Sequence, residues 1–234
     1  AVGQACGLLA DAAEEAAKEG RFVLTLGGDH SVASGSIAGI LRSRPSTGVL
    51  WVDAHADINT PMSSPSGNIH GMPVALLLGL IPLTNVPGHD FMDGVKLEPD
   101  RLVYVGLRAL DEEERSYLRD LGILAFTMTD IDRYGIGEVM DRAIARLGTD
   151  SPIHLSWDVD GCDPSVMPST GTPARGGLSY RESHFVCEAV ASTGTLASMD
   201  IVEVNPRIGS EEDVDMTLEN SLAIVGSALG ATIL

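Results

Sequence analysis

Acidic residues and histidines follow several apolar segments of this sequence, and their types and spacing suit the binding of a divalent metal ion. In the segment DAHAD, Asp53, His55 and Asp57 stand at alternate positions directly after the apolar run VLWV. Side chains at alternate positions of an extended segment point to the same side, so these groups could face one cation. Similar residues follow three other apolar runs: His30, Asp158, Asp160 and Glu203. Carboxylates and imidazoles are ligands for divalent cations.

The elements that must position these residues alternate between apolar runs and helical patterns. The apolar runs predict strands at 22–26, 49–52, 102–107, 123–128, 153–157 and 196–202. The periodic segments predict helices at 7–20, 33–45, 71–80, 112–122, 132–148 and 180–194, and a last helix from about residue 214. This alternation predicts an α/β fold with three layers, α/β/α, around a mostly parallel central sheet. Without repeats or linkers, residues 1–234 are expected to form a single domain.

This fold gives a test for the polar clusters, because ligands of open α/β sheets bind beyond the carboxyl ends of the strands. The clusters do follow predicted strands. The alternative is that each is a turn former or a helix cap. We assign Asp29 and the segment SYRE, Ser179 to Glu182, to helix capping. For the other clusters, carboxylates about 4 to 6 Å apart would raise one another's pKa and destabilise the fold unless cations lay among them.

The predicted ligand set indicates two metal ions rather than one. Four carboxylates and two imidazoles with no thiolate are too many for one tetrahedral zinc, and they favour adjacent divalent ions that share carboxylates. An oxygen-rich set without sulfur suits manganese. Two such ions lower the pKa of a shared water, so that hydroxide is available near neutral pH. The expected reaction is metal-assisted hydrolysis.

Composition excludes other classes of function. The chain has 33 acidic and 15 basic residues and a net charge of -18, which disfavours nucleic acid and anionic membranes as partners. No apolar run approaches the ~20 residues of a membrane span. The three scattered cysteines are expected to be free thiols, as in a reducing compartment. We therefore expect a cytoplasmic protein, with an organelle as the alternative if an upstream segment is missing.

Five motifs give the sequence a family resemblance. They are LGGDHS, WVDAHADINTP, SGNIHGMP, HLSWDVDGCDPSVMPSTGTPARGGLSYRE and DIVEVNP, and they span residues 26–206. Together they resemble the ureohydrolase superfamily and, within it, the arginases, binuclear manganese enzymes that hydrolyse L-arginine to L-ornithine and urea. By position, the resemblance implies one Mn²⁺ held by His30, Asp53, Asp57 and Asp158. It implies a second held by Asp53, His55, Asp158 and Asp160.

The resemblance also implies roles around the substrate. Asn59 and Ser66 would bind the α-carboxylate of arginine, and Asp111 its α-ammonium group, although Asp111 is also a candidate helix N-cap. The remaining residues carried over by the motifs are Asn68 and Thr172 for substrate binding, Glu203 for the guanidinium, and Asp57, His70 and Glu203 for catalysis. His70 would relay protons, while Asp57 would hold the attacking hydroxide and pass its proton to the leaving amine.

Some features depart from the family pattern and leave alternatives open. Arginases often have an Asp where Ala109 stands, and their chains usually begin with a strand and helix that precede the region matched here. We expect those elements to be absent from this chain, leaving part of the sheet unpaired. The resemblance further implies a homotrimer or homohexamer. The alternatives are an agmatinase, a guanidino-acid hydrolase, a protein that binds arginine or metal without turnover, and a one-metal deacetylase of related fold.

Overall fold

The computed structural model describes residues 1–232. Six strands form one parallel sheet: β1 (Val23–Leu26), β2 (Gly48–Val52), β3 (Leu102–Leu107), β4 (Leu124–Thr127), β5 (Ile153–Asp158) and β6 (Leu196–Val202). Their spatial order is β1-β6-β5-β2-β3-β4. The predicted α/β fold with a parallel central sheet is therefore confirmed, and all six predicted strands are present.

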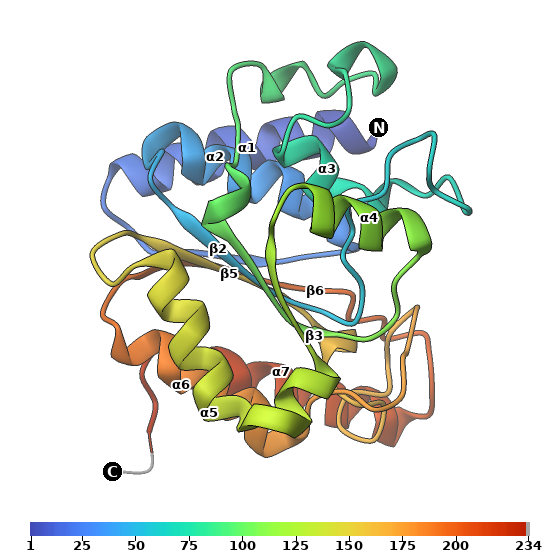
Figure 1. Cartoon of the computed structure of the whole chain (residues 1–234), viewed down its shortest axis with the longest axis vertical. Helices are drawn as coiled ribbons and strands as arrows, with labels where there is room; N and C mark the ends of the chain where they lie inside the picture. The colour runs from blue at the N-terminus through green and yellow to red at the C-terminus, as the bar shows by residue number, and fades with distance from the viewer. Residues whose placement is uncertain (233–234) are drawn as a thin grey trace.

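Helices cover both faces of this sheet, as Figure 1 shows. The helices are α1 (Val2–Lys18), α2 (Ala33–Ser43), α3 (Pro73–Leu77), α4 (Glu112–Asp120), α5 (Met128–Leu147), α6 (Tyr180–Ser192) and α7 (Glu211–Ala228). The first four lie on one face and the last three on the other. The three-layer arrangement predicted from the sequence is thus confirmed.

Strand β2 shows how the sequence divides the core between the two faces. Val49 and Trp51 pack with the helices α1 to α4, whereas Leu50 and Val52 pack with α5 to α7. All of these side chains are buried, because a central parallel strand has a helical layer on each side. The continuous apolar run that predicted a buried strand reflects this two-sided burial.

Some helix boundaries differ from the predictions. The helix predicted at 71–80 is only the short α3, and the chain leaves it through Gly79, whose φ is +73°. The helix predicted from residue 132 begins at Met128, where Thr127 accepts the N–H of Asp130, and Gly135 interrupts it with a φ of +78°. The caps assigned to Asp29 and to Ser179 with Glu182 are confirmed. Within residues 1–232, no helix has both the length and the hydrophobicity needed to span a membrane.

Candidate metal centre and its pocket

The carboxyl ends of four neighbouring strands bring the predicted ligands together. Strands β1, β6, β5 and β2 are adjacent in the sheet. Asp158 is the last residue of β5, and the other five predicted metal ligands lie in the segments that follow β1, β2 and β5. Five of the six side chains are buried, and His55 is partly exposed. The sequence rule that polar residues gather beyond the strand ends therefore holds in this fold.

The first group of ligands surrounds His30. Its Nδ1 lies 3.1 Å from Oδ2 of Asp53, 3.2 Å from Oδ2 of Asp57 and 3.2 Å from Oδ2 of Asp158. This Nδ1 is buried, yet no hydrogen bond satisfies it. Its other ring nitrogen, Nε2, lies 2.9 Å from Oγ of Ser156, which fixes the plane of the ring. An imidazole nitrogen aimed at three carboxylates is suited to share a cation with them.

The second group surrounds His55. Its Nδ1 lies 3.2 Å from Oδ2 of Asp160 and 3.4 Å from Oδ1 of Asp53. Possible metal-ligand atoms lie within 4.8 Å of one another in two triads: His30, Asp53 and Asp57, and Asp53, His55 and Asp160. Asp53 belongs to both triads, as expected for a bridging carboxylate. Asp158, the other predicted bridge, belongs to neither triad, although its Oδ2 faces His30.

Local hydrogen bonds hold the shared carboxylate in place. The indole Nε1 of Trp51 donates to Oδ2 of Asp53 at 2.9 Å, and the backbone N–H of His55 donates to its Oδ1 at 2.7 Å. The sequence analysis did not identify Trp51. A signal was present, since residues two apart on a strand share a face. The N–H of Asp160 similarly donates to Oδ1 of Asp158 at 2.8 Å.

Crowding of the carboxylates shifts their ionisation. Burial raises the pKa of Asp57 to about 7, and the charge of Asp53 adds to the increase. Burial likewise raises the pKa of Asp158 and of Asp160, each with help from neighbouring carboxylates. Burial opposes ionisation of Asp53 too, but the two imidazoles outweigh it and hold the pKa of Asp53 below its usual range. The carboxylates therefore raise one another's pKa as predicted, except for Asp53, which both histidines face.

The carboxylates around the two imidazoles favour the protonated, positively charged form of each ring. Burial lowers the pKa of His55, but Asp160 and Asp53 raise it to about 12. Burial also acts against protonation of His30, and its three carboxylate neighbours raise its pKa well above the ordinary value. A buried cluster that so favours positive charge, with oxygen and nitrogen donors and no sulfur, fits divalent cations.

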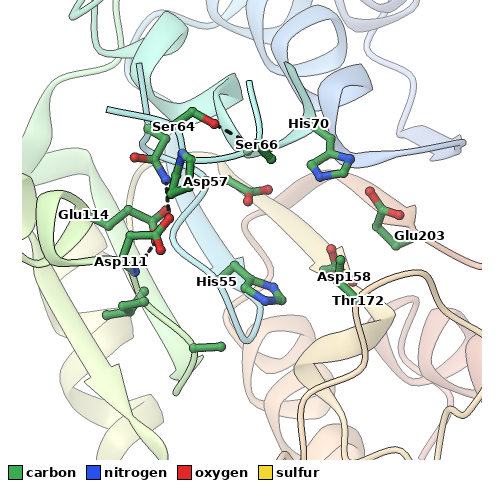
Figure 2. A pocket seen from close by; sticks show the side chains of 15 residues that line it. His55, Asp57, Ser64, Ser66, His70, Asp111, Glu114, Asp158, Thr172 and Glu203 are labelled. Carbon is green, nitrogen blue, oxygen red and sulfur yellow. Dashed lines mark hydrogen bonds between the residues drawn. The ribbon is translucent and has the colours of Figure 1, made fainter. Parts of the chain in front are cut away.

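A pocket of about 530 Å³ opens onto this cluster (Figure 2). Asp111 and Glu114 lie at one end of the view, His70 and Glu203 lie at the other, and Asp57 lies between them. The predicted residues that line the pocket are His55, Asp57, Asn59, Ser66, His70, Asp111, Asp158, Thr172 and Glu203. Asn68 does not line it; Asn68 is exposed and precedes a short 3₁₀ helix at Ile69–Gly71. Thr172 donates to Oδ2 of Asp160 at 2.8 Å.

The end of the pocket near Asp111 forms a linked polar group. Nδ2 of Asn59 donates to Oδ2 of Asp111 at 2.9 Å, and Glu114 accepts the backbone N–H of Asp111 at 3.0 Å. Asp111 is the N-cap residue of α4, which confirms the capping interpretation, and it also lines the pocket. Ser64 and Glu114 line the pocket but were missed. The Asp-x-x-Glu spacing of a capping box could have pointed to Glu114.

Glu203 is held at the opposite end by an unusual backbone conformation. Its φ of +66° is in the left-handed region, which is uncommon for residues other than glycine. Burial raises the pKa of Glu203, while the N–H of His30 favours its ionised form. A conformation of this kind costs free energy and is found most often at functional sites.

Comparisons with known proteins agree with this site. The arginase family matches residues 2–230. The arginase of Emericella nidulans is 52% identical over 226 residues, covering 94% of this chain and 69% of the relative, and human arginase-1 is 48% identical over 236 residues, covering 98% and 72%. The chain thus spans about 70% of these relatives' length. The arginase structure from Bacillus caldovelox matches with a TM-score of 0.92 and 43% identity, covering all of this chain and 77% of that one.

These comparisons favour arginine hydrolysis over the agmatinase, guanidino-acid hydrolase and non-catalytic alternatives. The chain therefore belongs to the arginase family and is a hydrolase that acts on the guanidino C–N bond of arginine.

Proposed function

We propose that this chain hydrolyses L-arginine to L-ornithine and urea with two Mn²⁺ ions in the pocket of Figure 2. His30, Asp53, Asp57 and Asp158 would hold one ion, and Asp53, His55, Asp158 and Asp160 the other. When bound, the two ions lower the pKa of water and so supply hydroxide for attack on the guanidinium carbon. The observation that carries this proposal is Asp53, whose two oxygens face the two imidazoles separately.

Glu203 would bind and orient the guanidinium. A guanidinium is a planar fork of N–H donors, and a carboxylate is its charge-assisted partner. Glu203 lines the pocket beside the predicted metal ligands, and it directly follows the last residue of strand β6. This position supports a role in holding the guanidinium carbon close to the metal centre, with Thr172 on the neighbouring loop.

The other end of the pocket would bind the amino-acid group. Asp111 offers a carboxylate to the α-ammonium, and Asn59 and Ser66 offer neutral donors to the α-carboxylate. Because Asn59 is hydrogen-bonded to Asp111, the two binding groups are held in one geometry. Asn68 remains a proposed substrate contact, and it would need the loop at residues 64–68 to close over the substrate.

Proton transfer would use Asp57 and His70. Asp57 would carry a proton to the leaving amine of ornithine, since its carboxylate lies between the two ends of the pocket. His70 is partly exposed and lines the pocket at the same end as Glu203, so its ring can exchange protons with solvent. We assign His70 the shuttle role on this basis.

We also propose the wider setting of the protein. Residues 1–234 form one arginase-like domain that works in the cytoplasm as a homotrimer or homohexamer. All three cysteines are buried and free, which supports a reducing compartment. Light scattering of the purified chain measures its molar mass and tests the oligomer.

The deciding experiment measures urea release from L-arginine, agmatine and guanidinobutyrate side by side, with the full chain loaded with Mn²⁺ and its metal content determined. We expect arginine to have the highest kcat/KM and the chain to hold two metal ions. Faster turnover of agmatine would overturn the assignment of Asn59 and Ser66. Arginine binding without urea release would overturn the catalytic proposal.

A further inference from the structure

The two loops that carry most of the ligands come from different strands. One loop follows β2 and carries Asp53 to Asp57, and the other follows β5, which ends at Asp158, and carries Asp160. The strands β2 and β5 are paired along their length, but their ladder ends at Val52 and Trp157. Beyond that point, other contacts must keep the two loops in register. The residue that makes these contacts is Arg108, which directly follows β3.

The side chain of Arg108 binds five backbone carbonyls of the site. Its Nη2 donates to the carbonyls of Asp160 at 2.5 Å, Ala174 at 2.8 Å and Cys162 at 3.1 Å. Its Nη1 donates to the carbonyls of Gly106 at 3.0 Å and Gly161 at 3.1 Å. Four of these acceptors belong to the loop at residues 159–176, which also carries Thr172. One partly buried guanidinium therefore holds both the start of this loop, at residues 160–162, and its end, at residue 174.

The backbone of Arg108 holds the other ligand loop. Its N–H donates to the carbonyl of Ala54 at 3.0 Å, and Ala54 lies between Asp53 and His55. The N–H of Ala54 in turn lies 3.3 Å from Oδ1 of Asp160. Arg108 thus connects the two loops that supply the second group of ligands.

The packing around this arginine leaves little room for another arrangement. A Cβ at Gly177 would overlap the Arg108 guanidinium and the backbone of Cys162. A Cβ at Gly161 would lie 3.1 Å from the backbone nitrogen of Asp53, closer than ordinary contact. Lysine could not replace the arginine fully, because an ammonium is a compact charge with three donors instead of a planar fork with five.

We propose that Arg108 is a positioning residue that fixes Asp160 against Asp53 and His55 and thereby sets the affinity of the second metal position. This inference rests on the proposed function for the identity of the ion. Arg108 does not line the pocket, and it belongs to neither triad of possible metal ligands. Its effect would pass through the carbonyls and the N–H group of the two loops.

The same strand offers a matched control. Arg101 directly precedes β3, as Arg108 directly follows it, and its guanidinium also binds backbone carbonyls, those of Leu147 and Ser46. Arg101 lies at the opposite end of the strand from the ligand loops. Loss of its contacts should reduce general stability in a similar way without touching the metal centre.

The experiment compares Arg108→Met and Arg108→Lys with Arg101→Met and Arg101→Lys in the full chain. Metal-stripped proteins are titrated with Mn²⁺ by equilibrium dialysis. We expect Arg108→Met to weaken the second binding step by about 10- to 100-fold, the usual effect of losing support behind a ligand. Arg108→Lys should give a smaller loss, and both Arg101 variants should bind like the wild type. Hydrogen exchange of the metal-free chains should be faster at residues 159–176 only in the Arg108 variants.

Each contrary outcome has a distinct meaning. Unchanged Mn²⁺ affinity in Arg108→Met would overturn the inference, and so would an equal loss in Arg101→Met, which would reveal a general stability effect. If the wild type binds fewer than two Mn²⁺ ions, the proposed function fails. Hydrogen exchange then decides the inference alone, and unchanged protection of residues 159–176 overturns it. If Arg108→Met does not fold, the two lysine variants carry the same comparison.

Discussion

The carboxylate of Glu203 accepts the backbone N–H of His30 at 2.7 Å, so a proposed substrate-binding group is bonded directly to a proposed metal ligand. The backbone N–H of Glu203 also donates to the carbonyl of Gly28 at 2.9 Å. These two bonds tie the end of β6 to the loop after β1. Besides its proposed role in binding the guanidinium, Glu203 therefore holds the loop that carries His30.

Substitution of Glu203 separates these two functions. In Glu203→Gln the amide oxygen can still accept the N–H of His30, but the charge that attracts the guanidinium is lost. Hydrogen bonds to charged groups contribute about 1.5 to 3 kcal/mol, so we expect kcat/KM for arginine to fall roughly 10- to 150-fold. In Glu203→Ala, kcat/KM should fall further, and the Mn²⁺ content should also be lower. Urea assays and elemental analysis measure both effects.

Glu219→Gln removes one negative charge from an exposed position of α7 and serves as the control. Its kcat/KM and metal content should match the wild type. Equal Mn²⁺ loss in Glu203→Gln and Glu203→Ala would argue against the hydrogen-bond explanation.

Asp158 is proposed as a bridge between both ions: its Oδ2 lies 3.2 Å from Nδ1 of His30, and its Oδ1 accepts the N–H of Asp160. Asp158→Asn replaces a carboxylate by a neutral amide, which is a poorer ligand for two cations. We expect both Mn²⁺ content and the rate of urea release to fall. Asp163→Asn is the matched control, because Asp163 lies in the loop that follows β5 and accepts N–H groups from Ser165 and Gly176. Full Mn²⁺ content in Asp158→Asn would exclude the bridging role.

Much of the site could be predicted because the ends of strands and the types of ligand residues can both be recognised in short stretches of sequence. The apolar run before Asp53 predicts a buried strand, and the alternation of Asp53 and His55 places both near its end. The expectation of one extended segment was too simple, however. The chain bends after Val52, and Asp57 adopts a φ of +50°. This conformation depends on the surrounding loops, which a local pattern does not describe.

Other features depend on contacts between distant segments. The end of α3 at Leu77 is an example, since the carbonyl of Leu77 accepts the N–H of Leu97, twenty residues along the chain. The apolar pattern of residues 71–80 gives no sign of this contact and predicts a longer helix. Glu114 is another, because its place in the pocket follows from how α4 packs. Sequence patterns predict elements well, but they do not contain the packing that ends or orients them.

Ser66 gives a test of substrate specificity. It is proposed to bind the α-carboxylate, which agmatine lacks. Ser66→Ala should therefore lower kcat/KM for arginine by roughly tenfold, the lower range for a hydrogen bond to a charged group, and leave that for agmatine nearly unchanged. Ser192→Ala is the control, because Ser192 is exposed on α6, does not line this pocket and donates its hydroxyl to the carbonyl of Ala189. An equal loss on both substrates would contradict the assignment.

His70 gives a test of proton transfer. General acid and base groups contribute roughly 10²- to 10⁴-fold to a rate, and a shuttle that water can partly replace lies at the lower end. We expect His70→Asn to lower kcat by roughly 10²-fold with unchanged Mn²⁺ content, and added imidazole to restore part of it. His184→Asn is the control, since His184 lies away from this pocket and contacts Ser227. An unchanged kcat would exclude the shuttle.

His154 of β5 and Asp200 of β6 form a buried pair on neighbouring strands. Nε2 of His154 lies 3.1 Å from Oδ2 of Asp200, and the hydroxyl of Ser36 donates to the same oxygen at 2.6 Å. Burial acts to raise the pKa of Asp200, but His154 and the hydroxyl groups outweigh it and lower the pKa below its ordinary value. The carboxylate is thus stabilised in its ionised form although it is fully buried.

Removal of one partner of this pair should destabilise the metal-free chain strongly. Asp200→Ala is expected to lower the free energy of unfolding by about 1 to 3 kcal/mol, because it leaves the buried Nε2 of His154 without its hydrogen-bond partner. The double variant with His154→Ala should lose less than the sum of the single changes. Urea denaturation at pH 7 measures these values, and additive losses would show that the pair is not coupled.

The pair also predicts how this stability depends on pH. An aspartate whose pKa is lowered by folding stabilises the protein above its unfolded pKa of about 3.9, and this contribution is lost as the pH falls through the folded pKa. The difference in unfolding free energy between wild type and Asp200→Asn should therefore be largest near neutral pH and shrink in acid. The metal ligands titrate in both proteins, so their effects cancel in this difference. A difference that grows as the pH falls would mean that Asp200 is protonated in the folded chain, and its ionised state would then have to be abandoned.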